Sequence, residues 1–144
     1  MRPSPRLSLF AILSGLVLAS APAGAEKYEY DLTNESVRQQ LWNGGWTTAN
    51  HGEGNGSGTS AGVQFHGKGE HITSPNLGCI ITNLVLTART TSSFSRPIIV
   101  FTNDVEMVTY SGIAQGTTGD LFNIDFGPNS LVNRFKIQSG TTGN

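Results

Sequence analysis

The chain has 144 residues, a formal net charge of −1 and charged side chains at only 13% of its positions. This length suits one domain with its own hydrophobic core, and the weak charge disfavours nucleic acid and anionic membrane surfaces as partners. The single cysteine, Cys79, excludes an intrachain disulfide.

The first 25 residues have the organisation of a secretory signal peptide. Arg2 and Arg6 give a basic start, residues 7–19 form an apolar run, and residues 23–25 give an Ala-Gly-Ala ending. The apolar run is shorter than the ~20 residues that a membrane-spanning helix needs. We therefore predict a signal peptide over residues 1–25 and a single exported domain over residues 26–144, secreted or at the cell surface, with no membrane span. Removing the two arginines leaves 7 basic against 10 acidic side chains, a net charge of −3.

From residue 27 onwards, apolar and polar residues alternate with a period of two, which is typical of β-strands. Residues 50–62 contain five glycines and are predicted to form a polar loop. The strands predicted on either side of residues 67–69 are expected to pair as a hairpin. Strands are predicted over residues 27–32, 42–48, 63–66, 70–74, 80–90, 97–102, 105–110, 121–126 and 131–138.

One segment has helical features instead. Asn34 is a preferred N-cap residue, Glu35 suits a first turn, and Val37 and Leu41 lie four residues apart. A helix of at most two turns is predicted over residues 34–41. With eight or nine short strands separated by Gly, Asn and Pro, the sequence indicates an all-β fold, an antiparallel β-sandwich of the jelly-roll type.

Four runs of residues resemble the jelly-roll modules of large secreted bacterial surface proteins. The first three are AGVQF at residues 61–65, EHITSP at 70–75 and ITNLVL at 81–86. The fourth, NRFKIQSG at 133–140, is similar to the penultimate strand of those modules. Such modules resemble carbohydrate-binding domains, so the resemblance implies a jelly-roll fold and the binding of glycan or another surface partner.

Modules of this kind continue past a Gly-Asn turn into a further strand, whereas this sequence stops at Gly143-Asn144. Two expectations stay open: the sequence is truncated or divergent, or the domain lacks its last strand. In the second case the strand predicted over residues 131–138 has an unpaired edge. Such an edge is open to self-association or to a strand from another chain.

Two tryptophans beside the glycine-rich loop are the candidates for ligand binding. An exposed indole stacks on the apolar face of a sugar ring, while amide side chains bond its hydroxyl groups. Because tryptophan is well buried on average, packing of both rings in the core is the alternative. The predicted ligand-binding residues are Trp42, Trp46, Asn43 and Asn50.

His66, Glu70 and His71 are weak candidates for metal ligands. The two histidines could approach one another across the predicted hairpin, although two imidazoles rarely hold zinc or copper without a third ligand. The alternative is that these side chains are solvated loop residues. No cofactor is predicted.

No set of catalytic residues is recognisable in the sequence. Asp120 and Asp125 would lie on opposite faces of a strand, and Ser57 lacks the strand-to-helix elbow of a hydrolase serine. We expect a secreted, non-catalytic β-sandwich module that binds glycan or a surface partner. The alternatives are a small secreted hydrolase or metal-dependent enzyme, and a structural surface subunit that assembles with another protein chain.

Overall fold

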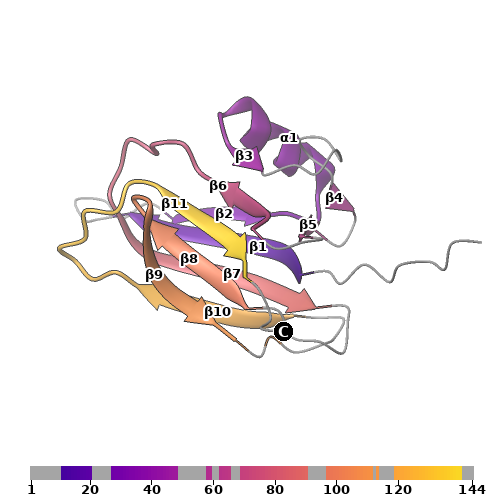
Figure 1. Cartoon of the computed structure of the whole chain (residues 1–144). Helices are drawn as coiled ribbons and strands as arrows, with labels where there is room; N and C mark the ends of the chain where they lie inside the picture. Colours follow the sequence, from indigo (N-terminus) through magenta and orange to yellow (C-terminus); the bar gives the residue numbers. More distant parts are fainter. Residues whose placement is uncertain are drawn as a thin grey trace, which may run out of the picture.

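The computed structural model describes residues 11–20, 27–48, 58–59, 62–65, 69–90, 97–111, 113 and 119–140. Over these residues the chain forms eleven strands and one helix, and the strands make two antiparallel sheets packed as a sandwich (Figure 1). The predicted antiparallel β-sandwich is confirmed, whereas the jelly-roll topology stays a prediction. Within the same residues, no helix has the length and apolar character required to cross a membrane.

The larger sheet contains six strands, in the order β10-β7-β1-β5-β4, with β2 also paired to β1. β1 lies in its middle: β7 pairs along one side of β1, while β5 and β2 pair in succession along the other side. The strands of this sheet are β1 (Ala11–Ser20), β2 (Lys27–Asp31), β4 (Gly58–Thr59), β5 (Gly62–Phe65), β7 (Ile81–Thr90) and β10 (Asp120–Asp125).

The smaller sheet contains five strands, in the order β3-β6-β11-β8-β9. Ile137 at the centre of β11 lies opposite Ile72 of β6 and Val100 of β8. Both sides of β11 are therefore paired, so this strand lacks the unpaired edge that was one of the two expectations left open by the sequence. The strands of this sheet are β3 (Thr47–Thr48), β6 (His71–Thr73), β8 (Ile98–Thr102), β9 (Val105–Tyr110) and β11 (Phe135–Ser139).

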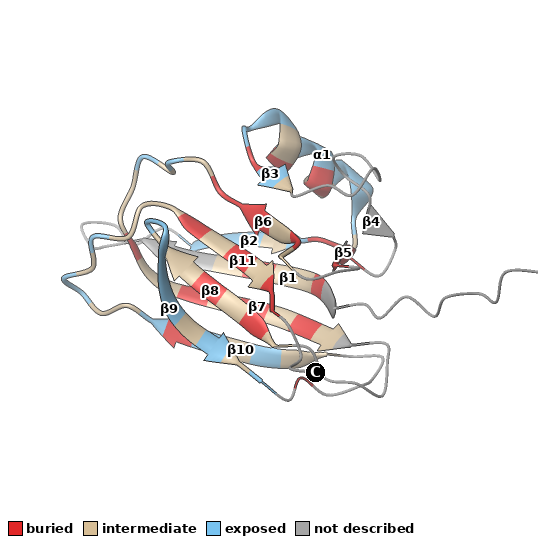
Figure 2. Cartoon of the chain, in the orientation of Figure 1, coloured by how far each residue is buried: buried red, intermediate tan, exposed pale blue. Residues whose placement is uncertain are grey.

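The hydrophobic core lies between the two sheets and follows the strand period of two. In β7, Leu84, Leu86 and Ala88 are all fully buried, and in β11 Phe135 and Ile137 are buried. Buried and half-buried residues alternate along β8 and β11 in Figure 2. The alternation predicted for these segments thus selects the face of each strand that packs inward.

β1 is formed by residues of the segment predicted as a signal peptide. A one-residue bulge at Ser14 shifts the register against β7, so that Leu13 and Leu16, three residues apart, both face the core and are fully buried. The Ser14 carbonyl accepts a hydrogen bond from the Leu32 amide at 3.0 Å. The sandwich therefore extends beyond the predicted domain of residues 26–144. The removal of residues 1–25 on export stays a prediction.

The predicted hairpin of residues 63–66 and 70–74 is wrong. β5 lies in the six-stranded sheet and pairs with β1 and β4, whereas β6 lies in the five-stranded sheet and pairs with β11 and β3. The chain crosses between the sheets here. The Gly69 amide accordingly donates to the Ser139 carbonyl of β11 at 2.8 Å.

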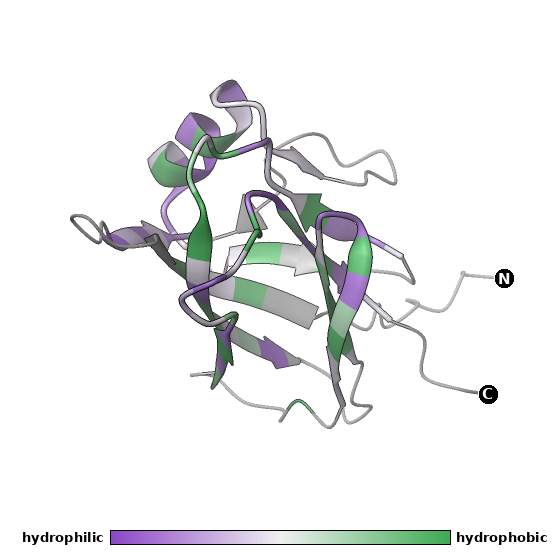
Figure 3. Ribbon diagram, turned by 90° about the vertical axis from the view of Figure 1, so that its left-hand side faces the viewer, coloured by the Kyte–Doolittle hydropathy of each residue, from purple (hydrophilic) through white to green (hydrophobic). Residues whose placement is uncertain are grey.

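Helix α1 (Glu35–Asn43) lies at one end of the sandwich, as Figure 1 and the perpendicular view in Figure 3 both show. The Asn34 side chain caps it by accepting from the Ser36 amide at 2.9 Å, as the sequence predicted. Arg38 is buried and donates to the Leu32 carbonyl at 2.7 Å, which ties the helix to the end of β2. The helix continues through Asn43, so that only Thr47 and Thr48 of the strand predicted over residues 42–48 are extended.

Candidate functional site

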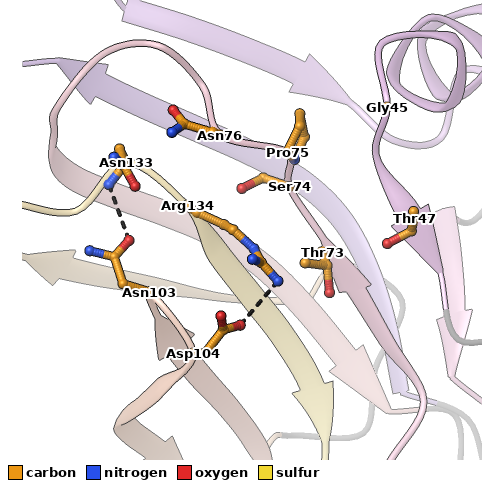
Figure 4. A pocket seen from close by; sticks show the side chains of 10 residues that line it. All are labelled: Gly45, Thr47, Thr73, Ser74, Pro75, Asn76, Asn103, Asp104, Asn133 and Arg134. Atoms are coloured by element: carbon orange, nitrogen blue, oxygen red, sulfur yellow. Dashed lines mark hydrogen bonds and ion pairs between the residues drawn. The ribbon is translucent and has the colours of Figure 1, made fainter.

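A polar pocket of about 440 Å³ lies at one end of the five-stranded sheet. Four chain segments meet there: the start of β3, the end of β6, the β8–β9 turn and the start of β11. Neighbouring antiparallel strands bring the end of one strand beside the start of the next, which explains why these segments converge. The residues around the pocket are Gly45, Thr47, Thr73, Ser74, Pro75, Asn76, Asn103, Asp104, Asn133 and Arg134 (Figure 4).

The β8–β9 turn forms one wall of the pocket. Asn103 and Asp104 both have positive φ angles, 47° and 68°, as a two-residue hairpin turn of type I′ requires. Asn and Asp adopt this left-handed conformation more readily than other residues with a side chain. The turn connects strands β8 and β9 directly, and it places the two polar side chains at the end of the sheet.

Asn103 joins this turn to the chain segment that leads into β11. Its side chain donates to the Leu131 carbonyl at 3.1 Å and accepts from the Asn133 amide at 3.4 Å. Its own backbone amide donates to the Arg134 carbonyl at 3.0 Å. The relative position of two walls of the pocket is therefore fixed by three hydrogen bonds from one residue.

The charges in the pocket are paired. An Arg134 guanidinium nitrogen lies 3.1 Å from a carboxylate oxygen of Asp104, and both side chains are substantially exposed (Figure 4). An exposed ion pair of this kind adds at most about 1 kcal/mol to stability, because solvent screens it. Its guanidinium and carboxylate edges still offer several hydrogen-bond donors and acceptors to a ligand.

The opposite wall is held by Ser74. Its amide donates to the Phe135 carbonyl at 2.9 Å, and its hydroxyl accepts from the Phe135 amide at 3.0 Å. Pro75 follows and contributes an apolar ring, and Asn76 accepts a hydrogen bond from the Gly78 amide at 2.9 Å through its side-chain oxygen. This hydrogen bond leaves the side-chain NH₂ group of Asn76 as its remaining polar group at the rim of the pocket.

The tryptophans proposed from the sequence lie elsewhere. Trp46 is only 5% exposed and packs edge-on against Tyr30 and Phe135, with ring centroids 5.9 and 5.4 Å apart. Its ring is part of the core, which was the alternative, so it offers no exposed face to a sugar. Trp42 is half-buried on α1, with a buried indole nitrogen that has no hydrogen-bond partner among the described residues.

The other candidates from the sequence do not line the pocket. Asn43 is exposed at the end of α1, and Asn50 lies outside the described residues. His66 also lies outside them. Glu70 is buried, and the Nδ1 atom of His71 lies 3.0 Å from the Gly69 carbonyl oxygen. Since β5 and β6 belong to different sheets, the hairpin geometry that would have brought the two histidines together is absent.

The pocket residues were missed because each is an ordinary turn residue in the sequence. Asn103-Asp104 and Asn133-Arg134 are separated by about thirty positions, and only the pairing of β8 with β11 brings them together. The short polar pair between the two predicted strands at 97–102 and 105–110 was the available signal. It predicted a turn but gave no indication of what the turn would face.

Two partly buried tyrosines are expected to make the stability of the folded domain depend on alkaline pH. Burial raises the pKa of Tyr30 above 10.0, with a smaller contribution from the negative charge of Cys79, and burial also raises the pKa of Tyr110 above 10.0. In the unfolded chain both phenols ionise near their ordinary pKa of about 10. Their contribution to stability is thus complete below about pH 10 and is lost as the pH rises through the higher pKa values of the folded state.

We therefore expect the unfolding temperature to fall above about pH 10, and to fall less steeply in a Tyr30→Phe, Tyr110→Phe variant. Unfolding followed by circular dichroism between about pH 8 and pH 11 measures this difference. Parallel curves for the two proteins would contradict the assignment of the effect to these phenols.

The pocket combines amide, hydroxyl, guanidinium and carboxylate groups beside one apolar ring, a set suited to binding a hydroxyl-rich molecule. Over the part of the chain that the structure describes, no group of three or more His, Cys, Asp or Glu side chains is placed to hold a metal ion. Comparison of the chain with protein-family models, with curated proteins and with solved structures found no match.

Proposed function

We propose that this protein is a secreted, non-catalytic β-sandwich module of the jelly-roll type that binds a neutral glycan in the pocket at the end of the five-stranded sheet. The observation that carries the proposal is the gathering of Asn76, Asn103, Asp104, Asn133 and Arg134 around one hollow. The resemblance of the sequence to jelly-roll modules supports the same class of function, and the signal-like segment supports an extracellular location.

A neutral glycan matches the chemistry of the pocket walls. Sugar hydroxyls both donate and accept hydrogen bonds, and amide, guanidinium and carboxylate groups supply both kinds of partner. Because Arg134 and Asp104 neutralise each other, the pocket has no excess charge to attract a strongly ionic ligand. The Pro75 ring supplies a surface for the apolar face of a sugar.

Binding fits the pocket better than hydrolysis does. Glycoside hydrolysis requires two carboxyl groups on opposite sides of the bond, one of them protonated. Among the residues that line the pocket, Asp104 is the one carboxylate, and its partner is the Arg134 guanidinium at 3.1 Å.

The proposal is tested by measuring binding of the full chain to a panel of immobilised neutral and anionic oligosaccharides. Arg134→Ala is expected to weaken binding about 10-fold or more, since it removes hydrogen bonds from a charged donor, and Asn133→Ala about 3- to 10-fold. Neither change is expected to unfold the protein, because both side chains lie at the surface of the pocket.

The matched control is Asn43→Ala, which removes the same amide group from the exposed end of α1. We expect it to leave glycan binding unchanged. If Asn43→Ala weakened binding and Asn133→Ala did not, the site would lie beside Trp42 rather than in the pocket. A panel without any bound neutral sugar would refute the proposed function.

A further inference from the structure

The place of β1 in the six-stranded sheet has the features of a site for an exchangeable strand. β1 forms nine residue pairs with β7, from Ala11 opposite Thr90 to Ser20 opposite Ile81. On its other side it pairs with β5 over residues 11–13 and with β2 over residues 15–19. β1 therefore joins β7, β5 and β2, which do not pair with one another in this sheet. Their other neighbours are β10, which pairs with β7, and β4, which pairs with β5.

Without residues 11–20, a slot of defined shape would remain. β7 would present one side of a ten-residue strand, and β2 would lose the strand with which it pairs. The core would lose the two fully buried side chains of Leu13 and Leu16. A row of unpaired backbone groups beside exposed apolar surface is a site to which another strand adds readily.

The walls of the slot specify what can occupy it. Gly62 of β5 lies directly against the β1 backbone, because a Cβ at this position would overlap the Leu13 carbonyl oxygen. The occupant must therefore be an extended backbone in close contact with β5. Over residues 11–20 that occupant carries no charged side chain, and its two buried leucines fill the core between the sheets.

We propose that this slot is a strand-acceptor site. Residues 11–20 fill it while residues 1–25 are in place, and an uncharged, apolar strand of about ten residues from another protein chain fills it once the signal peptide is removed. The inference rests on the export that forms part of the proposed function. It goes beyond glycan binding, since the slot lies in the six-stranded sheet and the pocket at the end of the five-stranded sheet.

The test uses the full chain with a specific protease site inserted between Ala25 and Glu26. After folding and cleavage, the N-terminal fragment is expected to remain bound through β1 and to co-elute with the rest of the chain in size-exclusion chromatography. A labelled peptide of residues 9–22 with a solubilising lysine tail is then added and the sample is heated and cooled. We expect the labelled peptide to replace the fragment.

Added peptide is also expected to raise the unfolding temperature of the cleaved protein, by about 10 °C at a peptide concentration 100 times its Kd. The matched control is the same peptide with Leu16→Asp, which puts a charge at a fully buried position and should neither exchange nor stabilise.

Two results would overturn the proposal. One is that the fragment leaves and the remaining chain unfolds at the temperature of the uncut protein. The other is that the remaining chain unfolds without the fragment and the peptide does not restore it. Glycan binding by the uncut chain is measured separately, so that a loss of glycan binding and a loss of strand exchange are seen as different results. N-terminal sequencing of the exported protein reports whether the signal peptide is removed.

Discussion

Replacing Phe135 with alanine is expected to lower the free energy of unfolding by about 3–5 kcal/mol, the range found when a buried aromatic ring is truncated. Phe135 is 1% exposed at the start of β11, and its ring meets Trp46 edge-on with centroids 5.4 Å apart. Its backbone is also held by Ser74, so the surrounding chain cannot easily collapse into the space left by the ring. Urea unfolding followed by tryptophan fluorescence measures the loss.

Phe101 on β8 provides the matched control. It lies on the outer face of the same sheet, half-buried, with the Lys136 ammonium nitrogen 3.9 Å from its ring centroid. We expect Phe101→Ala to cost about 1 kcal/mol, from the lost cation–π contact and a small loss of burial. Equal losses for the two variants would contradict the assignment of inner and outer faces in this sheet.

With residues 1–25 in place, replacing Leu16 with alanine is expected to lower the free energy of unfolding by about 2–5 kcal/mol, because a fully buried leucine leaves a cavity when it is truncated. The result separates two roles of the same residue. A leucine in a leader that lies outside the fold contributes nothing to the stability of the domain. A leucine in β1 contributes as much as any other core leucine.

Leu121 of β10 is the control for this second variant, because it is 71% exposed in the same sheet. Leu121→Ala should change the free energy of unfolding by no more than about 0.5 kcal/mol. Chemical unfolding of both proteins with residues 1–25 in place gives the comparison. A Leu16 variant as stable as the Leu121 variant would show that β1 is not part of the cooperative unit.

The sequence predicted the positions of most strands because alternation depends only on which face of a strand is buried. The alternation placed Leu84, Leu86 and Ala88 of β7 on one face of the strand, and all three are fully buried in the structure. The same signal carries no information about partners. Hence β5 and β6, adjacent in the sequence, were expected to pair, although they lie in different sheets.

The composition of the apolar N-terminal run is compatible with both a signal peptide and a buried strand. A signal peptide needs an uncharged apolar segment, and so does a strand in the middle of a buried sheet. The bulge at Ser14 brings Leu13 and Leu16, three residues apart, to one face. The buried residues of this strand therefore do not follow the period of two by which strands are recognised in a sequence. The strand is recognisable only once β7 and β2 are in place beside it.

The candidate site could not be predicted from the sequence for a related reason. The sequence pointed to exposed aromatic rings, but Trp46 is buried in the core and packs against Tyr30 and Phe135. The polar groups that do gather come from turns whose separation in the sequence is large. These groups are close together because of the order of the strands in the sheet, and no local sequence motif indicates this order.

The three hydrogen bonds of Asn103 have a consequence for the thermodynamics of ligand binding. Ordering a loose loop around a ligand costs conformational entropy, and this cost is subtracted from the affinity. Here hydrogen bonds within the protein join the β8–β9 turn to the segment before β11 through Asn103. A sugar would therefore meet walls that are rigid beforehand, and the affinity of the pocket would depend mainly on the hydrogen bonds themselves and little on the reorganisation of the protein.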